Sequence, residues 1–179
     1  MTDHAKALKA LETDFRNMDA TEVGGRLGHE EPRSAIILFG SVVESHISDL
    51  LENYFKEAEV DGEVILDLYG ARTFAQRIDL AFKLDLIDQG TKERAHLVRN
   101  MRNAAAHSME KIDFAHPTIA AAADELIGTD RFVDPQYKQW IFGLRCFAIG
   151  VYLDDEKTFS QGVSDAIRKW ESVRIKPEA

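Results

Sequence analysis

The chain has 179 residues, which is enough to bury one substantial hydrophobic core and does not require a second domain. Its formal net charge of −9 opposes a broad electrostatic surface for nucleic acid, so we expect no direct binding to duplex DNA. The single cysteine, Cys146, lies in an apolar segment and excludes an intrachain disulfide, which is typical of a reducing cytoplasm.

Targeting and membrane signals are not apparent in the sequence. Residues 1–10 mix charged side chains with small ones and contain no apolar run, which argues against a signal peptide. The longest apolar stretch, 140–153, is too short to span a bilayer and contains Arg145. We therefore expect a cytoplasmic protein without membrane association.

Apolar residues recur at helical spacing along almost the whole chain, and sustained alternation of apolar and polar residues is nearly absent. The sequence therefore predicts an all-α protein, a single-domain bundle of about seven to eight helices over 1–179 with its core in 31–173. An N-terminal helix is expected over 1–19. A glycine-rich loop follows over 20–31, and it lacks the Gly-Lys-Ser/Thr ending that a phosphate-binding loop requires.

The longest predicted helix runs from Pro32 to Ala58 and should pack along an antiparallel partner helix. Its apolar seam consists of Ile36, Gly40, Val43, Ile47, Leu50 and Tyr54. Three more apolar residues widen this stripe and predict contacts on two sides: Ile37, Leu51 and Phe55. Glu44 lies close to the stripe, where a carboxylate is costly to desolvate unless a cation meets it. We expect that cation to be an arginine of the helix at 92–108.

The remaining segments also have helical patterns. In chain order they are 64–69, 73–88, 92–108, 117–127, 135–154 and 160–173. Thr73 and Thr91 are the expected N-caps of the segments at 73–88 and 92–108. Pro117 suits a first helical turn, Gly128 the end of that helix, and Asp134-Pro135 the start of the next. The 135–154 segment is apolar on most sides, which predicts a central or interface helix.

The 92–108 helix carries the residues best suited to chemistry, in the run from Arg102 to His107. At about 100° per residue its core face consists of Leu97, Val98, Met101, Ala104 and Ala105. The opposite face is a ridge formed by His96, Arg99, Asn100, Asn103 and His107. Arg102 flanks this ridge and diverges from His107 by about 140°, whereas Asn103 and His107 face each other. Asn103 is therefore the residue best placed to orient the imidazole.

An arginine and a histidine on one helix can act on a phosphodiester, because the imidazole transfers a proton while the guanidinium stabilises charge that develops on the phosphate. The same side chains are commonly structural, as an ion-paired arginine and a histidine at the end of a helix. The spacing favours the structural role. The local charge favours phosphate binding, since this helix carries one acidic residue, Glu93, and four basic ones: Lys92, Arg94, Arg99 and Arg102. The residues leave both interpretations open.

Other kinds of site find little support. Four histidines lack the spacing of metal ligands: His4, His29, His46 and His116. We therefore expect no metal site, and we expect no cofactor. The serines of the 32–58 helix lack the strand-to-helix turn of a serine hydrolase nucleophile. Trp140 and Trp170 are expected to pack against other side chains rather than to stack on bases.

Several segments, in a fixed order, carry a resemblance to a known family. They are Arg33-Ser34-Ala35-Ile36, the helix through Glu44 to Leu51, Thr73-Phe74-Ala75-Gln76-Arg77-Ile78, Leu84-Asp85-Leu86-Ile87, and Leu97-Val98-Arg99-Asn100-Met101-Arg102-Asn103 with Ala106-His107-Ser108. Over 33–153 the chain resembles the mannitol operon repressor (MtlR) family. This resemblance implies a helical transcriptional regulator without an obvious DNA-binding motif.

The run from Arg102 to His107 also resembles the Arg-x4-His motif of HEPN domains, helical modules that include dimeric, metal-independent ribonucleases. That resemblance implies that Arg102 stabilises the phosphorane, that Asn103 is the polar residue after the arginine, and that His107 is the general acid or base. Relatives in the repressor family often carry Asp-Phe-Ala before the histidine, where this chain has Ala104-Ala105-Ala106.

Two functions follow as expectations. The first is a non-enzymatic transcriptional regulator of the mannitol repressor type that acts through a protein partner, with structural or interface roles for Glu44, Arg99, Arg102 and His107. Such a chain would be a homodimer through the 135–154 helix or through the ridge. The alternative is a HEPN-type endoribonuclease, or an inactive relative of one, that binds RNA and uses Arg102, Asn103 and His107 as catalytic residues.

Overall fold

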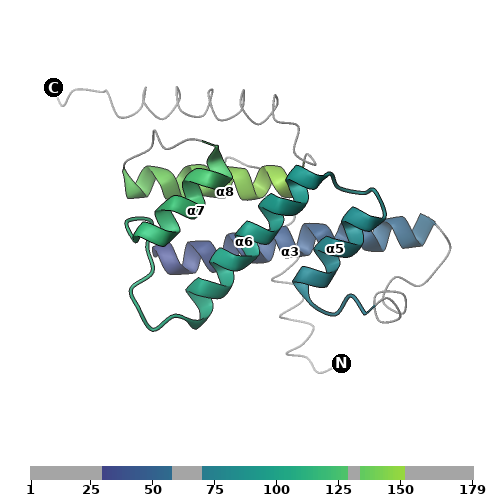
Figure 1. Ribbon diagram of the computed structural model, residues 1–179, viewed down its shortest axis with the longest axis horizontal. Helices are drawn as coiled ribbons and strands as arrows, with labels where there is room; N and C mark the ends of the chain where they lie inside the picture. Colours follow the sequence, from purple (N-terminus) through teal and green to yellow (C-terminus); the bar gives the residue numbers. More distant parts are fainter. Residues whose placement is uncertain (1–29, 58–69, 129–133, 152–179) are drawn as a thin grey trace.

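The computed structural model describes residues 30–57, 70–128 and 134–151, and these residues form five helices without a strand (Figure 1). The helices are α3 (Pro32–Glu57), α5 (Phe74–Lys83), α6 (Gln89–His107), α7 (Pro117–Ile127) and α8 (Pro135–Val151). The all-α prediction is confirmed for this part of the chain. The segments predicted at 1–19, 64–69 and 160–173, and nearly all of the 20–31 loop, lie outside the described residues.

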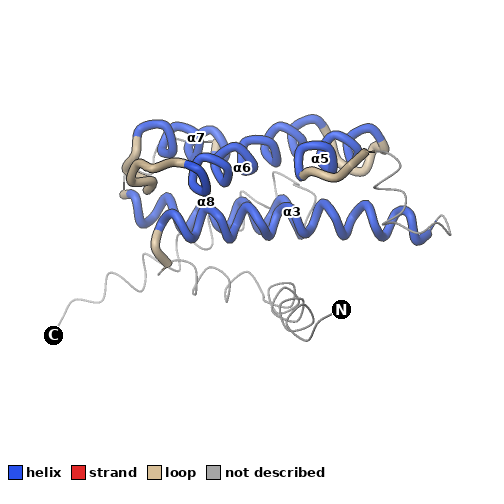
Figure 2. The backbone as a smooth tube through the Cα atoms, turned by 90° about the horizontal axis from the view of Figure 1, so that it is seen from below, coloured by secondary structure: helices blue, strands red, loops and turns tan. Residues whose placement is uncertain are grey.

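The helices form two layers. Figure 2 shows α3 and α8 in one layer and α5, α6 and α7 in the other. Arg33 at the start of α3 bonds to the carbonyl of Ser108 just after α6, so α3 and α6 run in opposite directions, and α6 crosses α3 obliquely (Figure 1). Gln139 near the start of α8 donates to the Glu30 carbonyl just before α3, so α3 and α8 run in the same direction.

The buried face of α3 differs in part from the predicted seam. Its buried apolar residues are Ala35, Ile36, Phe39, Val43, Ile47, Leu51 and Phe55. Leu50 is partly buried and packs against the core, whereas Tyr54 is 39% exposed, so the predicted seam is wrong at Tyr54. The physical reason is that α3 packs against both α6 and α8, which turns the buried stripe toward Phe39 and away from Tyr54.

A close contact between α3 and α8 depends on the missing side chain of a glycine. The ring of Phe39 packs edge-on against Phe142 with 5.9 Å between ring centroids. A Cβ at Gly143 would lie only 2.1 Å from the Phe39 ring. Gly143 therefore provides the space that this buried ring occupies.

Helix α3 is also long and apolar enough, by length and composition, to cross a membrane over Pro32–Lys56. Helices α5, α6 and α8 pack against α3, and its buried side chains belong to the shared core. The buried core helix of a globular protein has the same composition, and we interpret α3 as such a helix.

Local rules predict several helix ends correctly. Thr73 is the N-cap of α5 and forms a reciprocal capping box with Gln76. Helix α7 begins at Pro117 and ends at Gly128, whose φ of 78° is left-handed and favours glycine. Helix α8 begins at Pro135, as predicted.

The boundary between α5 and α6 differs from the prediction. Helix α5 ends at Lys83, and Asp85 adopts a φ of 56° that cannot continue a helix. Helix α6 begins at Gln89 with Asp88 as its N-cap, because the Asp88 carboxylate accepts the Thr91 N–H at 2.6 Å. The prediction of Thr91 as the cap is therefore wrong, and Thr91 is a buried residue of the first turn.

Helix α8 packs its apolar side chains into the core, where Ile141, Phe142, Cys146 and Ile149 are buried. Burial raises the pKa of the Cys146 thiol well above its usual range, as expected for a small hydrophobic residue. Two polar contacts join α8 to α7. Lys138 forms an ion pair with Asp124 at 2.7 Å, and Arg145 Nε donates to the Leu126 carbonyl at 3.1 Å. The buried apolar side chains of α8 thus belong to the core that it shares with α3 and α7.

Candidate functional site

Helix α6 presents a different core face from the one predicted. Its buried residues are Thr91, Ala95, Val98, Met101 and Ala105. Leu97 is partly buried and packs against the core, but Ala104 is exposed, so the prediction of Ala104 as a core residue is wrong. The core face is rotated because α6 lies across α3 on the side of Arg102, where the backbones of the two helices approach closely.

Arg102 lies in the contact between α6 and α3. A Cβ at Gly40 would lie 2.7 Å from the Arg102 Cβ and 2.8 Å from its Cδ, so the aliphatic stem crosses α3 where that helix has no side chain. One helical turn further along α3, Glu44 Oε2 meets Arg102 Nη1 at 2.9 Å. The predicted pair between Glu44 and an arginine of this helix is confirmed, and the arginine is Arg102 rather than Arg99.

The pair is only partly withdrawn from water. The Arg102 side chain is 30% exposed and that of Glu44 is 28% exposed. Its Coulomb attraction is therefore screened more than that of a fully buried pair, but less than that of a surface pair. The contact links α3 to α6 and neutralises the Arg102 charge.

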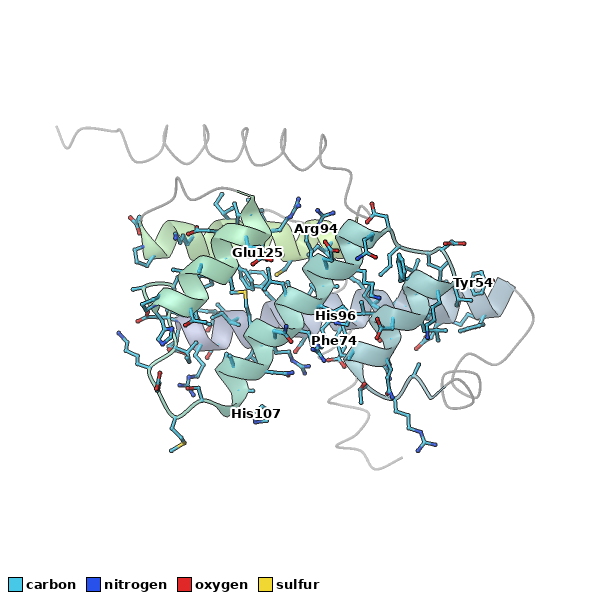
Figure 3. The ribbon with its side chains drawn as sticks, viewed as in Figure 1. Tyr54, Phe74, Arg94, His96, His107 and Glu125 are labelled. Carbon is cyan, nitrogen blue, oxygen red and sulfur yellow. The ribbon has the colours of Figure 1, made fainter. Side chains whose placement is uncertain are left out.

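Asn103 and His107 lie on the solvent side of α6 and both are exposed. Figure 3 shows the His107 ring at the last turn of α6, pointing away from the other helices. No hydrogen bond joins Asn103 to His107 among the described residues, so the predicted orienting contact is not formed. The structure therefore separates the three candidate residues: Arg102 faces α3, whereas Asn103 and His107 face water.

Arg99 lies on the ridge one turn before Arg102. Its Nη2 donates to the side-chain oxygen of the adjacent Asn100 at 2.7 Å. The Arg99 Nε atom is buried and has no hydrogen-bond acceptor. In the part of the chain that the structure describes, no carboxylate lies within ion-pair distance of Arg99, in contrast to Arg102.

Other charges near the ridge are neutralised by acidic residues. Lys92 and His96 both approach Asp79 Oδ1 of α5, at 3.0 and 3.3 Å, and the Lys92 ammonium lies 4.7 Å from the centroid of the Phe82 ring. The hydrogen bond from Lys92 lowers the pKa of Asp79. The positive patch expected on this helix is thus partly compensated by α5.

Sequence reasoning did not identify the residue that holds the end of this helix. Arg33 of α3 donates from Nη1 to the Ser108 carbonyl at 3.0 Å and from Nη2 to the Glu110 carbonyl. These bonds satisfy a carbonyl at the α6 C-cap and another in the following loop, and they fix the backbone next to His107. The signal was available, because antiparallel packing puts the start of α3 beside the end of α6.

Metal ligands do not gather in the described residues, where no group of three His, Cys, Asp or Glu side chains could hold an ion. His116 pairs with Glu110 at 3.4 Å in the loop between α6 and α7. His4 and His29 lie outside the described residues.

Comparison of the chain with protein-family models, with curated proteins and with solved structures finds no match. What the site can do is therefore inferred from its contacts. They show one arginine that is paired and packed, one arginine without a carboxylate partner, and an exposed amide and imidazole on the same helix.

Proposed function

We propose that the chain is a non-enzymatic transcriptional regulator of the mannitol repressor type that acts through a protein partner. The observation that carries the non-enzymatic part is the pairing of Arg102 with Glu44 at 2.9 Å. A group that stabilises a phosphorane must point at the charge that develops in the transition state. The Arg102 guanidinium points instead at a carboxylate of its own chain.

The packing of the Arg102 stem supports this proposal. The stem passes so close to Gly40 that even a methyl group there would collide with it. Turning the guanidinium toward a substrate beside His107 would therefore break the ion pair and move the stem from its place beside Gly40. These contacts favour the interpretation of Arg102 as an ion-paired arginine that joins α3 to α6.

The regulatory part of the proposal rests on the sequence resemblance over 33–153. We further propose a homodimer in the cytoplasm, with no membrane association, no direct contact to duplex DNA, and no metal or cofactor. The mass of the purified protein in solution, measured by light scattering across a range of concentrations, tests the dimer. A mass of one chain at every concentration would contradict it.

A HEPN-type endoribonuclease remains the second candidate, and the exposure of Asn103 and His107 favours it. An imidazole in open solvent can reach a 2′-hydroxyl of a bound RNA strand and take its proton. Without Arg102, however, the developing phosphate charge would need another cation.

The two candidates are separated by incubating purified protein with labelled single-stranded RNA in the presence of a chelator. His107→Ala removes the candidate acid or base, and Asn100→Ala is the matched control on the same exposed face of α6. We expect the RNA to stay intact with all three proteins. Cleavage by the wild type and by Asn100→Ala, but not by His107→Ala, would overturn the non-enzymatic proposal.

A further inference from the structure

Most arginines whose bonds the structure describes connect one part of the fold to another. Arg33 and Arg77 donate to carbonyl or hydroxyl groups outside their own helices, Arg145 donates to the end of α7, and Arg102 pairs with Glu44. Each of these bonds joins one element to another. Such arginines are not available to a ligand without loss of a contact between helices.

Arg99 differs from these arginines. Its hydrogen bond goes to its neighbour Asn100, which connects no second element. Its Nε atom is buried without an acceptor, and the described residues offer its guanidinium no carboxylate. Because the Nε atom is enclosed by protein, a partner from solvent would meet the terminal nitrogens of the Arg99 guanidinium rather than Nε. A guanidinium that meets no carboxylate among the described residues favours an anionic ligand, because charge-assisted hydrogen bonds are the stronger ones.

Arg99 is also the first residue of a polar row. Arg99, Asn103 and His107 are separated by four residues each, so they lie on consecutive turns of α6, about 6 Å apart along its axis. Asn103 and His107 are exposed (Figure 3 for His107). The row offers a guanidinium, an amide and an imidazole, and all three can donate hydrogen bonds to anionic oxygen atoms.

We propose that the row Arg99, Asn103 and His107 is a binding site for a phosphate group, with Arg99 as its cation. A phosphate presents several oxygen atoms at once, so it can accept from the guanidinium fork while it accepts from the neighbouring side chains. The cation of this helix that meets a ligand is thus Arg99, since Arg102 is occupied by Glu44. The assignment goes beyond the proposed regulatory function, because it gives the helix a ligand.

The phosphate could belong to a small phosphorylated molecule or to the backbone of a single-stranded RNA. Titrations with inorganic phosphate, with adenosine monophosphate and with a short single-stranded RNA distinguish these sources. Binding is followed by calorimetry for the two small ligands and by fluorescence anisotropy for the labelled RNA. If adenosine monophosphate binds as well as RNA, the site recognises the phosphate monoester, and if RNA alone binds, it recognises the phosphodiester strand. Either result supports the site.

Arg99→Gln is the decisive variant, and Lys83→Gln at the exposed end of α5 is its matched control, since it removes the same charge from another surface. Loss of charge-assisted hydrogen bonds to phosphate should weaken binding by about tenfold or more in Arg99→Gln. Lys83→Gln should change affinity by less than about twofold, because an exposed charge elsewhere contributes only screened attraction. Circular dichroism confirms that both variants are folded.

Two results would overturn the site: no binding of any of the three probes to the wild type, or equal binding by the wild type and Arg99→Gln. The same RNA samples are run on a gel after titration, which keeps this proposal separate from the preceding one. Cleaved RNA contradicts the non-enzymatic function, whereas intact RNA that does not bind, together with the failure of both small ligands, contradicts the phosphate site alone.

Discussion

The ion pair between Glu44 and Arg102 gives the most direct test of how α3 and α6 are joined. At 2.9 Å and an effective dielectric constant of about 20, the Coulomb attraction is about 6 kcal/mol before desolvation. Desolvation cancels most of this, and both side chains keep nearly a third of their exposure. Exposed pairs contribute up to about 1 kcal/mol, and breaking buried ones costs about 3–5 kcal/mol. We therefore expect a coupling energy of about 1–2 kcal/mol.

A double-mutant cycle measures this coupling. Glu44→Gln removes the charge with little change of shape, and Arg102→Met keeps an aliphatic stem beside Gly40 while it removes the guanidinium. The free energy of unfolding of the wild type, both single variants and the double variant is measured in urea, which does not screen charges. Each single variant should be less stable than the wild type, because it leaves one charge without its partner. The double variant should lose about 1–2 kcal/mol less than the sum of the two single losses.

Salt provides the independent check. In about 1 M sodium chloride the Debye length falls to about 3 Å, so a partly exposed pair should lose a large part of its coupling. A coupling energy within about 0.3 kcal/mol of zero at low salt would refute the reasoning, because Arg102 would then be held by its stem alone. A coupling that is unchanged in salt would show that the pair is more deeply buried than its exposure indicates.

Three further predictions concern stability. Gly143→Ala should lower the free energy of unfolding, measured in urea, by about 2–3 kcal/mol, since its Cβ would overlap the Phe39 ring. Adding Phe39→Leu to the same chain should recover much of that loss. If stability is not recovered, the strain lies elsewhere. Gly128→Ala should cost about 1 kcal/mol in the same assay because of the positive φ, and an unchanged midpoint would contradict this. The hydrogen bond from Lys92 lowers the pKa of Asp79, so the ionised carboxylate stabilises the fold above its unfolded pKa, and this contribution is lost as the pH falls through the folded pKa. Asp79→Asn should therefore make the free energy of unfolding less dependent on pH in the acid range. A curve parallel to that of the wild type would exclude the contact.

The helix ends show how far local rules reach. Pro117, Gly128 and the capping box at Thr73 were predictable because each depends on the backbone geometry of a few neighbouring residues. The start of α6 was not, since Asp88 and Thr91 are both good capping residues three positions apart. Which of them caps the helix depends on where the preceding turn at Asp85 directs the chain.

The candidate site was predicted in its residues but not in its arrangement. The need of Glu44 for a cation followed from its position beside an apolar stripe, and the structure supplies Arg102. The helical wheel placed Arg102 beside the ridge, but it could not show that α3 approaches there. That approach requires Gly40, and a glycine in a helix pattern does not reveal which side chain passes over it.

The sequence by itself determined that the described chain is helical, where several helices begin and end, and which helix carries arginine, amide and imidazole side chains. These properties depend on spacing and on the preferences of residues close to one another in the chain. Only the tertiary structure decided that Arg102 is paired and Arg99 is not. The reason is that the environment of a charged side chain is set by residues far away in sequence, here Gly40 and Glu44 of α3, which packing brings to one side of α6.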